Sequence, residues 1–268
     1  VASGNFAGID TNFTDLQARA ASSGIVLNPT SVKFAGVQQG ASFSSVGGTD
    51  QRGFHLIFNS GGTVTVKRVT GTSYAWSVHA DNLSTWQKDY HTITSEVTIG
   101  TFAVPPACSL IYSQAKTWIE GTVAGKVTLV AADAGSFSPD IILRGNIGYA
   151  TTDGSSGISA IAEHSVLIPL VVPSAMSIRG VFVAQTGYFG RDLYDCTYAP
   201  YDIRSSLTMN GTVVSNLRTG TKWGYGWCSG ISGFQTRVDS YDRLLAFSPP
   251  PFTPAASVDY KLSLWREQ

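Results

Sequence analysis

One short phrase recurs four times in the second half of the chain: an apolar residue, a polar residue, glycine, any residue and a second apolar residue. The four copies are Ile119–Val123, Leu143–Ile147, Ile178–Phe182 and Met209–Val213. Their glycines lie 24, 35 and 31 residues apart, a spacing typical of stacked structural units. Because Val, Ile and Thr are abundant around each copy, the repeat predicts a right-handed parallel β-helix with one phrase in each coil.

The glycine of each phrase has a structural explanation in such a coil. Glycine relieves steric crowding where the backbone must bend into a corner. We therefore expect Gly121, Gly145, Gly180 and Gly211 to lie on successive coils of one wound sheet. Valine at Gly145 or Gly180 is expected to damage folding.

The N-terminal part of the chain predicts a capping helix and a β-hairpin. The segment Thr14–Ala21 offers a helix-starting hydroxyl and good helix formers, and Gly24 ends it. Two strand-like runs, Phe54–Phe58 and Thr63–Val69, flank the glycine-bearing turn Asn59–Gly62. We expect the helix to cover one end of the β-helix, where apolar edges would otherwise be exposed.

A domain boundary is predicted near the break Val104–Pro106. The run His91–Ile99 alternates polar and apolar residues in the manner of a half-buried strand, and the prolines end it. We therefore divide the chain into an N-terminal cap and β-rich segment, residues 1–107, and a β-solenoid domain, residues 108–268.

The composition argues against nucleic-acid binding and against a membrane span in this chain. Charged residues make up 13% of the chain, with 18 basic and 18 acidic residues, and no basic cluster is present. No apolar run approaches the roughly 20 residues that a membrane helix needs. The chain opens at Val1 without a methionine or a signal-peptide pattern, so we expect that it was processed or trimmed.

Three cysteines, Cys108, Cys196 and Cys228, match no zinc or redox motif. Cys196 and Cys228 are disulfide candidates. Their bond would close a loop of about 33 residues and stabilise the fold by roughly 3–4 kcal/mol. Such a bond would imply an oxidising compartment. Three separate buried thiols are the alternative.

The richest polar cluster of the sequence is Arg191 with Asp192, Asp195 and Asp202. The three aspartates are candidate metal ligands, because calcium takes six to eight oxygen ligands. Parallel β-helix lyases also combine acidic calcium sites with a basic residue. A loop salt bridge to Arg191 is the simpler explanation, so we expect no cofactor, with calcium as the one candidate.

Trp223, Tyr225 and Trp227 alternate with glycines and are the candidate ligand-binding residues. Exposed flat rings would suit a sugar face or a partner protein, whereas buried rings would pack beside Cys228.

The adjacent pair Glu163 and His164 is not expected to act together, because neighbouring side chains of a strand point to opposite faces. The sequence contains no nucleophile elbow, P-loop, dinucleotide fingerprint or His/Cys metal set, so we expect no enzyme.

Longer phrases, densest between residues 110 and 220, point to a known family. They are Trp118–Val123 with Lys126–Val130, Arg144–Tyr149 with Asp153 and Gly154, Ile161–Glu163 with Val166–Pro169, and Gly180 with Ala184, Gln185 and Gly187–Arg191. These phrases resemble the C-terminal module of type IV pilin-like, pilus-assembly-associated surface proteins of bacteria. The two ends of the chain, Ser3–Asp10, Ser248–Pro250 and Trp265–Glu267, fit the same pattern. Such proteins usually carry a pilin-type hydrophobic N-terminal helix, which is absent from these 268 residues.

The resemblance implies an extracellular domain displayed on the bacterial cell surface. We therefore expect a structural or adhesive domain of a pilus-associated (minor-pilin-like) or filament-forming protein. Its partners would be other pilus or filament subunits, copies of itself, or a glycan or host-surface ligand. The alternative is a carbohydrate-active enzyme, resembling a polysaccharide lyase, on a β-helix scaffold.

Overall fold

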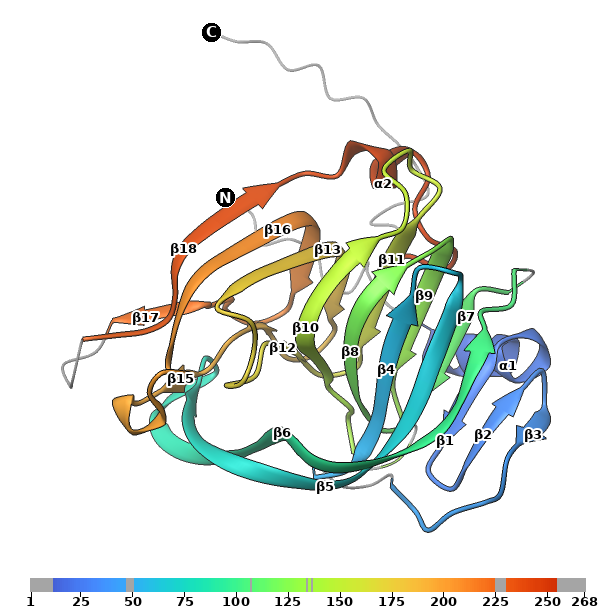
Figure 1. The fold of residues 1–268 in the computed structure, drawn as a ribbon, viewed down its shortest axis with the longest axis horizontal. Coiled ribbons are helices and arrows are strands. Elements are labelled where there is room, and N and C mark those ends of the chain that lie inside the picture. Colours follow the sequence, from blue (N-terminus) through green and yellow to red (C-terminus); the bar gives the residue numbers. More distant parts are fainter. Residues whose placement is uncertain are drawn as a thin grey trace, which may run out of the picture.

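The computed structural model describes residues 12–46, 51–106, 108–133, 135, 137–224 and 230–254. Within these residues eighteen strands belong to one mixed sheet, which curls around its core as a half-barrel (Figure 1). Two α-helices accompany the sheet in the same residues. The prediction of an all-β protein is confirmed.

In chain order the elements are α1 (Phe13–Ser23), β1 (Ile25–Asn28), β2 (Ser31–Phe34), β3 (Val37–Gln39), β4 (Gly53–Asn59), β5 (Thr63–His79), β6 (Asn82–Ala103), β7 (Leu110–Ser113), β8 (Lys116–Val123), β9 (Lys126–Ala131), β10 (Ile141–Tyr149), β11 (Gly157–Ala162), β12 (Val166–Leu167), β13 (Ala175–Ala184), β14 (Phe189–Gly190), β15 (Leu193–Tyr194), β16 (Ile203–Ser215), β17 (Lys222–Gly224), β18 (Ile231–Ser240) and α2 (Arg243–Phe247).

The four glycine phrases lie on neighbouring parallel strands. Strands β8, β10, β13, β16 and β18 pair in parallel in that order, and the phrases occupy the first four of them. Gly180 lies directly opposite Gly211 in the register. Gly121 instead faces Ile147, because a register shift follows Leu143. A second parallel series, β7, β9, β11 and β13, runs beside the first.

A right-handed parallel β-helix is not supported for the chain as a whole, because the sheet is mixed. β4, β5 and β6 pair antiparallel with one another, as do β1, β2 and β3. The physical reason lies in the connections: the turns Ser60–Gly62 and Ala80–Asp81 join consecutive strands, and tight turns can join only antiparallel strands. Strand β4 also pairs in parallel with β8, across the predicted boundary at residue 107.

The predicted N-terminal helix and hairpin are confirmed, but Asn12 and not Thr14 caps the helix. Helix α1 begins after Asn12, whose side-chain oxygen accepts a hydrogen bond from the Asp15 amide at 3.0 Å, and ends at Gly24. Leu16 of this helix is buried against the strands β1 and β7. The hairpin pairs β4 with β5 and turns through Gly62, whose φ of +78° favours glycine. The predicted strand at His91–Ile99 lies within β6.

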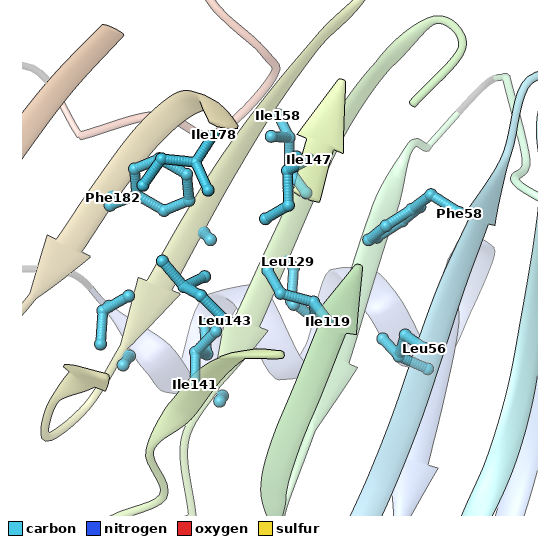
Figure 2. Packing of buried hydrophobic residues seen from close by; sticks show 14 of the residues in the cluster. Leu56, Phe58, Ile119, Leu129, Ile141, Leu143, Ile147, Ile158, Ile178 and Phe182 are labelled. Carbon is cyan, nitrogen blue, oxygen red and sulfur yellow. The ribbon is translucent and has the colours of Figure 1, made fainter. Parts of the chain in front are cut away.

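The main core fills the space between the two parallel series (Figure 2). The view shows apolar side chains of β8 and β10 pointing toward those of β9, β11 and β13. The labelled residues are Leu56, Phe58, Ile119, Leu129, Ile141, Leu143, Ile147, Ile158, Ile178 and Phe182, and each is at least 97% buried. Full burial of one such side chain contributes roughly 1.5–3 kcal/mol, so these rows hold the curl of the sheet together.

A histidine bridge joins β4, β6 and β8. The two ring nitrogens of buried His55 lie 2.8 Å from Glu96 and 3.0 Å from Glu120. Lys67 pairs with Glu96 and Arg144 pairs with Glu120, each at 2.5 Å. Burial acts to raise the pKa of Glu96, but the hydrogen bonds from Lys67 and His55 outweigh it and lower the pKa overall. The His55 contact is the main cause of the lowered pKa of Glu120.

These lowered pKa values predict a loss of stability in acid. A carboxylate with a lowered folded-state pKa stabilises the fold above its unfolded value of 4.5. That stability disappears as the pH falls through the folded-state pKa. The urea midpoint of the wild-type chain is therefore expected to drop between pH 6 and pH 3, and to drop less in Glu120→Gln. Burial raises the pKa of Glu163, so Glu163→Gln is a control that should not reduce the acid loss. Equal acid loss in wild type and Glu120→Gln would contradict this account.

Candidate functional site

The structure buries one of the predicted ligand-binding aromatics. Trp223 lies in β17, and its indole Nε1 donates a hydrogen bond to the carbonyl of Arg191 at 2.7 Å. This ring therefore packs the interior and offers no flat surface to a ligand. Tyr225 and Trp227 lie outside the described residues.

Exposed aromatic side chains gather instead on the long β5–β6 hairpin. We call Tyr74, Trp76, Lys88 and Tyr90 the aromatic face. Tyr74 lies 6.1 Å from Trp76 and 5.7 Å from Tyr90, measured between ring centroids. The Lys88 Nζ lies 4.5 Å from the Tyr74 centroid and 5.3 Å from the Trp76 centroid, within cation–π range. Tyr74 is 48% exposed and Trp76 is 43% exposed.

Strand alternation places these residues on one side of the hairpin. Trp76 pairs with Lys88 across the hairpin, and the next pair, Ala75 with Asp89, is buried on the opposite side. Tyr74 and Trp76 are two residues apart, and this spacing is the signal in the sequence for the aromatic face. The face was not predicted from it because every half-buried strand shows the same alternation.

A short loop segment holds the hairpin from the side of β15. The hydroxyl of Tyr198 accepts a hydrogen bond from the Trp76 amide at 2.6 Å. Tyr198 ends the 3₁₀ helix Cys196–Tyr198. Cys196 is disulfide-bonded and Cys108 is a buried free thiol, while Cys228 lies outside the described residues. The curved path of β5 and β6 toward β15 is visible in Figure 1.

Beneath the aromatic face lies a group that we call the buried polar cluster: His79, Asp89, His91 and Asp192. His79 Nε2 lies 2.6 Å from Asp89 Oδ1, and His91 Nδ1 lies 4.0 Å from Asp89 Oδ2. Three hydroxyls donate to the carboxylates at the rim of this cluster. Ser77 and Tyr194 donate to Asp89 at 2.5 and 3.1 Å, and Tyr188 donates to Asp192 at 2.6 Å.

The cluster contains strongly perturbed groups. Burial raises the pKa of Asp192 well above its usual value, and the neighbouring Asp89 charge raises it further. Burial acts in the same direction on Asp89, but the nearby histidines outweigh it and lower the pKa. Burial lowers the pKa of His91 to about 4, with the charge of Lys116 as the next cause. The pKa of His79 rises to about 9, because the Asp89 hydrogen bond and nearby negative charges outweigh burial.

The three predicted metal ligands are used in different ways. Asp192 belongs to the buried polar cluster, whereas Asp195 caps the 3₁₀ helix by accepting from the Thr197 amide at 2.9 Å. The Asp202 carbonyl accepts from the Gly233 amide. Among the described residues, the metal-ligand type side chains that converge within 4.8 Å of one another are His79, Asp89 and Asp192.

Two further polar groups of the sequence have structural roles. The guanidinium of buried Arg191 donates to the backbone carbonyls of Pro169, Leu170 and Tyr201. His164 pairs with Asp140 at 2.8 Å, while Glu163 accepts from the Asp133 amide. Both residues lie in a bend between β11 and β12, so the strand alternation behind the expectation does not apply to them, and each has its own partner.

Comparison of the chain with protein-family models, with curated proteins and with solved structures found no match. Within the described residues, neither helix has the length and apolar character needed to cross a lipid bilayer.

Proposed function

We propose that this chain is an extracellular adhesive domain of a pilus-associated or filament-forming bacterial surface protein, and that its aromatic face binds a glycan. The single observation that supports this most strongly is the exposed arrangement of Tyr74 and Trp76 around the Lys88 ammonium. Exposed rings gathered on one surface usually mark a binding site.

The chemistry of the aromatic face suits an acidic sugar. Flat rings offer apolar area at low conformational cost, while the tyrosine hydroxyls can exchange hydrogen bonds with sugar hydroxyls. The ammonium of Lys88 lies between two rings, where it can pair with a carboxylate of the ligand. We therefore infer that the glycan carries a negative charge, as uronic acids do.

The scaffold suits display. The parallel series of strands gives a stiff body, and we propose that it acts as a set of stacked coils below the hairpin. The disulfide at Cys196 lies in the segment that contacts Trp76 through Tyr198, which supports an oxidising extracellular setting. Little charge and abundant hydroxyl residues fit the same setting.

Glycan binding is tested by replacing the tryptophan of the aromatic face. Trp76→Ala is expected to weaken binding to an acidic polysaccharide such as polygalacturonate by at least about 30-fold, the effect of an interface hot spot. Phe247→Ala is the matched control, because this ring is 90% exposed but lies in α2, outside the hairpin. Binding is measured by calorimetry, and circular dichroism checks that both variants fold. Equal weakening in the two variants, or no binding by the wild type, would contradict the proposal.

The filament-forming alternative rests on a different observation. Among the described residues, β18 pairs with β16 along most of its length, while its other edge pairs only at Ile231–Gly233. An open edge can pair with another chain. Light scattering distinguishes the filament-forming subunit from the adhesive domain. An apparent molecular mass that grows with protein concentration supports assembly through this edge, whereas a stable monomer that binds glycan supports the adhesive domain.

A further inference from the structure

We propose that the buried polar cluster is a metal centre that binds one divalent transition-metal ion of the zinc type. The inference goes beyond glycan binding and rests on the geometry of four side chains. They come from β5, from β6 and from the segment between β14 and β15. The ligand set is two imidazoles and two carboxylates.

Three of the four side chains already converge. His79, Asp89 and Asp192 each offer one ligand atom, and these atoms all lie within 4.8 Å of one another. In a tetrahedral zinc site with bonds of about 2.0–2.2 Å, neighbouring ligand atoms lie roughly 3.3–3.6 Å apart. The hydrogen bond of 2.6 Å between His79 and Asp89 must therefore open slightly when the ion binds. This shift is roughly 0.7–1.0 Å, and a pair of ligand atoms at the 4.8 Å limit would have to close by roughly 1.2–1.5 Å.

His91 supplies an independent observation. Its side chain is 94% buried, and its Nδ1 has no hydrogen-bond partner among the described residues. A buried polar atom without a partner is costly and needs an explanation. The same Nδ1 lies 4.0 Å from Asp89 Oδ2, on the side of the cluster. Coordination of a metal ion would satisfy it.

The charge balance points in the same direction. Asp89 and Asp192 are nearly fully buried, and among the described residues Asp192 forms no ion pair. Ionising both carboxylates in a low-dielectric interior is costly, and a divalent cation between them would offset that cost.

The ligand types select the ion. Imidazole nitrogens suit zinc and neighbouring first-row metals, whereas calcium takes six to eight oxygen ligands and magnesium prefers oxygen ligands with several waters. The hydroxyls of Ser77, Tyr194 and Tyr188 donate to the carboxylates, as the outer partners of metal sites do. His79 has 22% of its side chain exposed, so the ion has a route from solvent.

The position of the cluster gives the ion a structural effect. Asp192 lies next to β15, which pairs with β5 at Val78 and Ser77. A metal ion would therefore cross-link the hairpin to the body of the protein directly below the aromatic face. We expect thermal stability to rise on metal binding.

The test uses the complete, tag-free chain stripped with a chelator and then dialysed against zinc chloride alone. We expect about one zinc ion per chain by mass spectrometry of metals, a raised melting temperature, and no comparable effect of calcium or magnesium. Co²⁺ in place of zinc should give the intense visible absorption of a tetrahedral site with nitrogen and oxygen ligands. Absence of zinc from the wild-type chain after this treatment overturns the proposal.

Variants locate the ion. His79→Gln and His91→Gln are expected to weaken zinc binding by at least the ~10–100-fold that removal of outer partners produces. His164→Gln is the matched control, because His164 also pairs with a carboxylate, Asp140, but lies outside the cluster. Circular dichroism shows whether each variant folds. If the cluster variants do not fold, the cobalt spectrum of the wild-type chain decides whether the ion occupies a tetrahedral site with nitrogen and oxygen ligands. Unchanged zinc binding in a folded His79→Gln, or an octahedral cobalt spectrum, overturns the proposal.

Discussion

Replacing Gly211 with valine is expected to prevent the chain from folding stably. Gly211 has a φ of +147°, which favours glycine, and a Cβ at this position would overlap the carbonyl oxygen of Gly180 on the paired strand. Neither atom can move without breaking the ladder between β13 and β16. We expect a loss of more than about 4 kcal/mol, the range of severe backbone and packing defects.

The matched control for this prediction is Gly148→Val in β10. A Cβ at Gly148 would meet no atom within 4 Å, so this change is expected to stay within about ±0.5 kcal/mol. Gly180→Val should be nearly as damaging as Gly211→Val, because Gly180 also has a positive φ and an added Cβ would lie 2.8 Å from Cγ2 of Ile158. Gly145→Val should be milder, since a Cβ there would meet the side chain of Glu120 and no backbone atom, although displacing this side chain would disturb its contacts with His55 and Arg144. The stability of all four variants is measured by urea unfolding and by the yield of soluble protein. Wild-type stability of Gly211→Val would refute the argument.

The second large effect is expected from Arg191→Met. Arg191 is fully buried, and its guanidinium binds the carbonyls of Pro169, Leu170 and Tyr201. Methionine fills much of the volume but leaves three carbonyls without a donor. A buried polar group left unsatisfied costs about 1–3 kcal/mol, so we expect a loss of roughly 3–5 kcal/mol in unfolding free energy.

Two comparison variants sharpen this prediction. Arg191→Lys keeps a cation but loses the planar fork that reaches three carbonyls, so it should also destabilise the fold. Arg218→Met removes a charge from an exposed position and should change stability by less than about 0.5 kcal/mol. Chemical denaturation compares the three variants. A neutral or stabilising effect of Arg191→Met would mean that desolvation of the guanidinium outweighs its hydrogen bonds.

Local patterns in the sequence predicted the local structure. Helix α1, the turn through Gly62 and the placement of the glycine phrases on neighbouring strands all follow from short-range signals. Each depends on a backbone preference or a side-chain period that a few consecutive residues reveal. The all-β character follows for the same reason.

The mixed sheet and the candidate site depend on contacts between distant segments. Leu193 of β15 pairs with Val78 of β5, and this pairing brings Asp192 to His79. No local pattern records such a pairing. The spacing of Asp89 and His91 does place both side chains on one face of β6, so half of the cluster could have been found. Asp195 and Asp202 were grouped with Asp192 only because they are close in sequence.

The attachment of the hairpin determines how the protein would carry a load. β5 is held by β4 between Thr63 and Val69 and by β15 at Ser77 and Val78, so the segment with Tyr74 and Trp76 lies between two anchors. A force applied to these rings is shared between the pairing with β4 and the pairing with β15. Neither pairing then has to separate one hydrogen bond at a time from a free strand end. Traction on the proposed ligand would thereby pass into the body of the sheet.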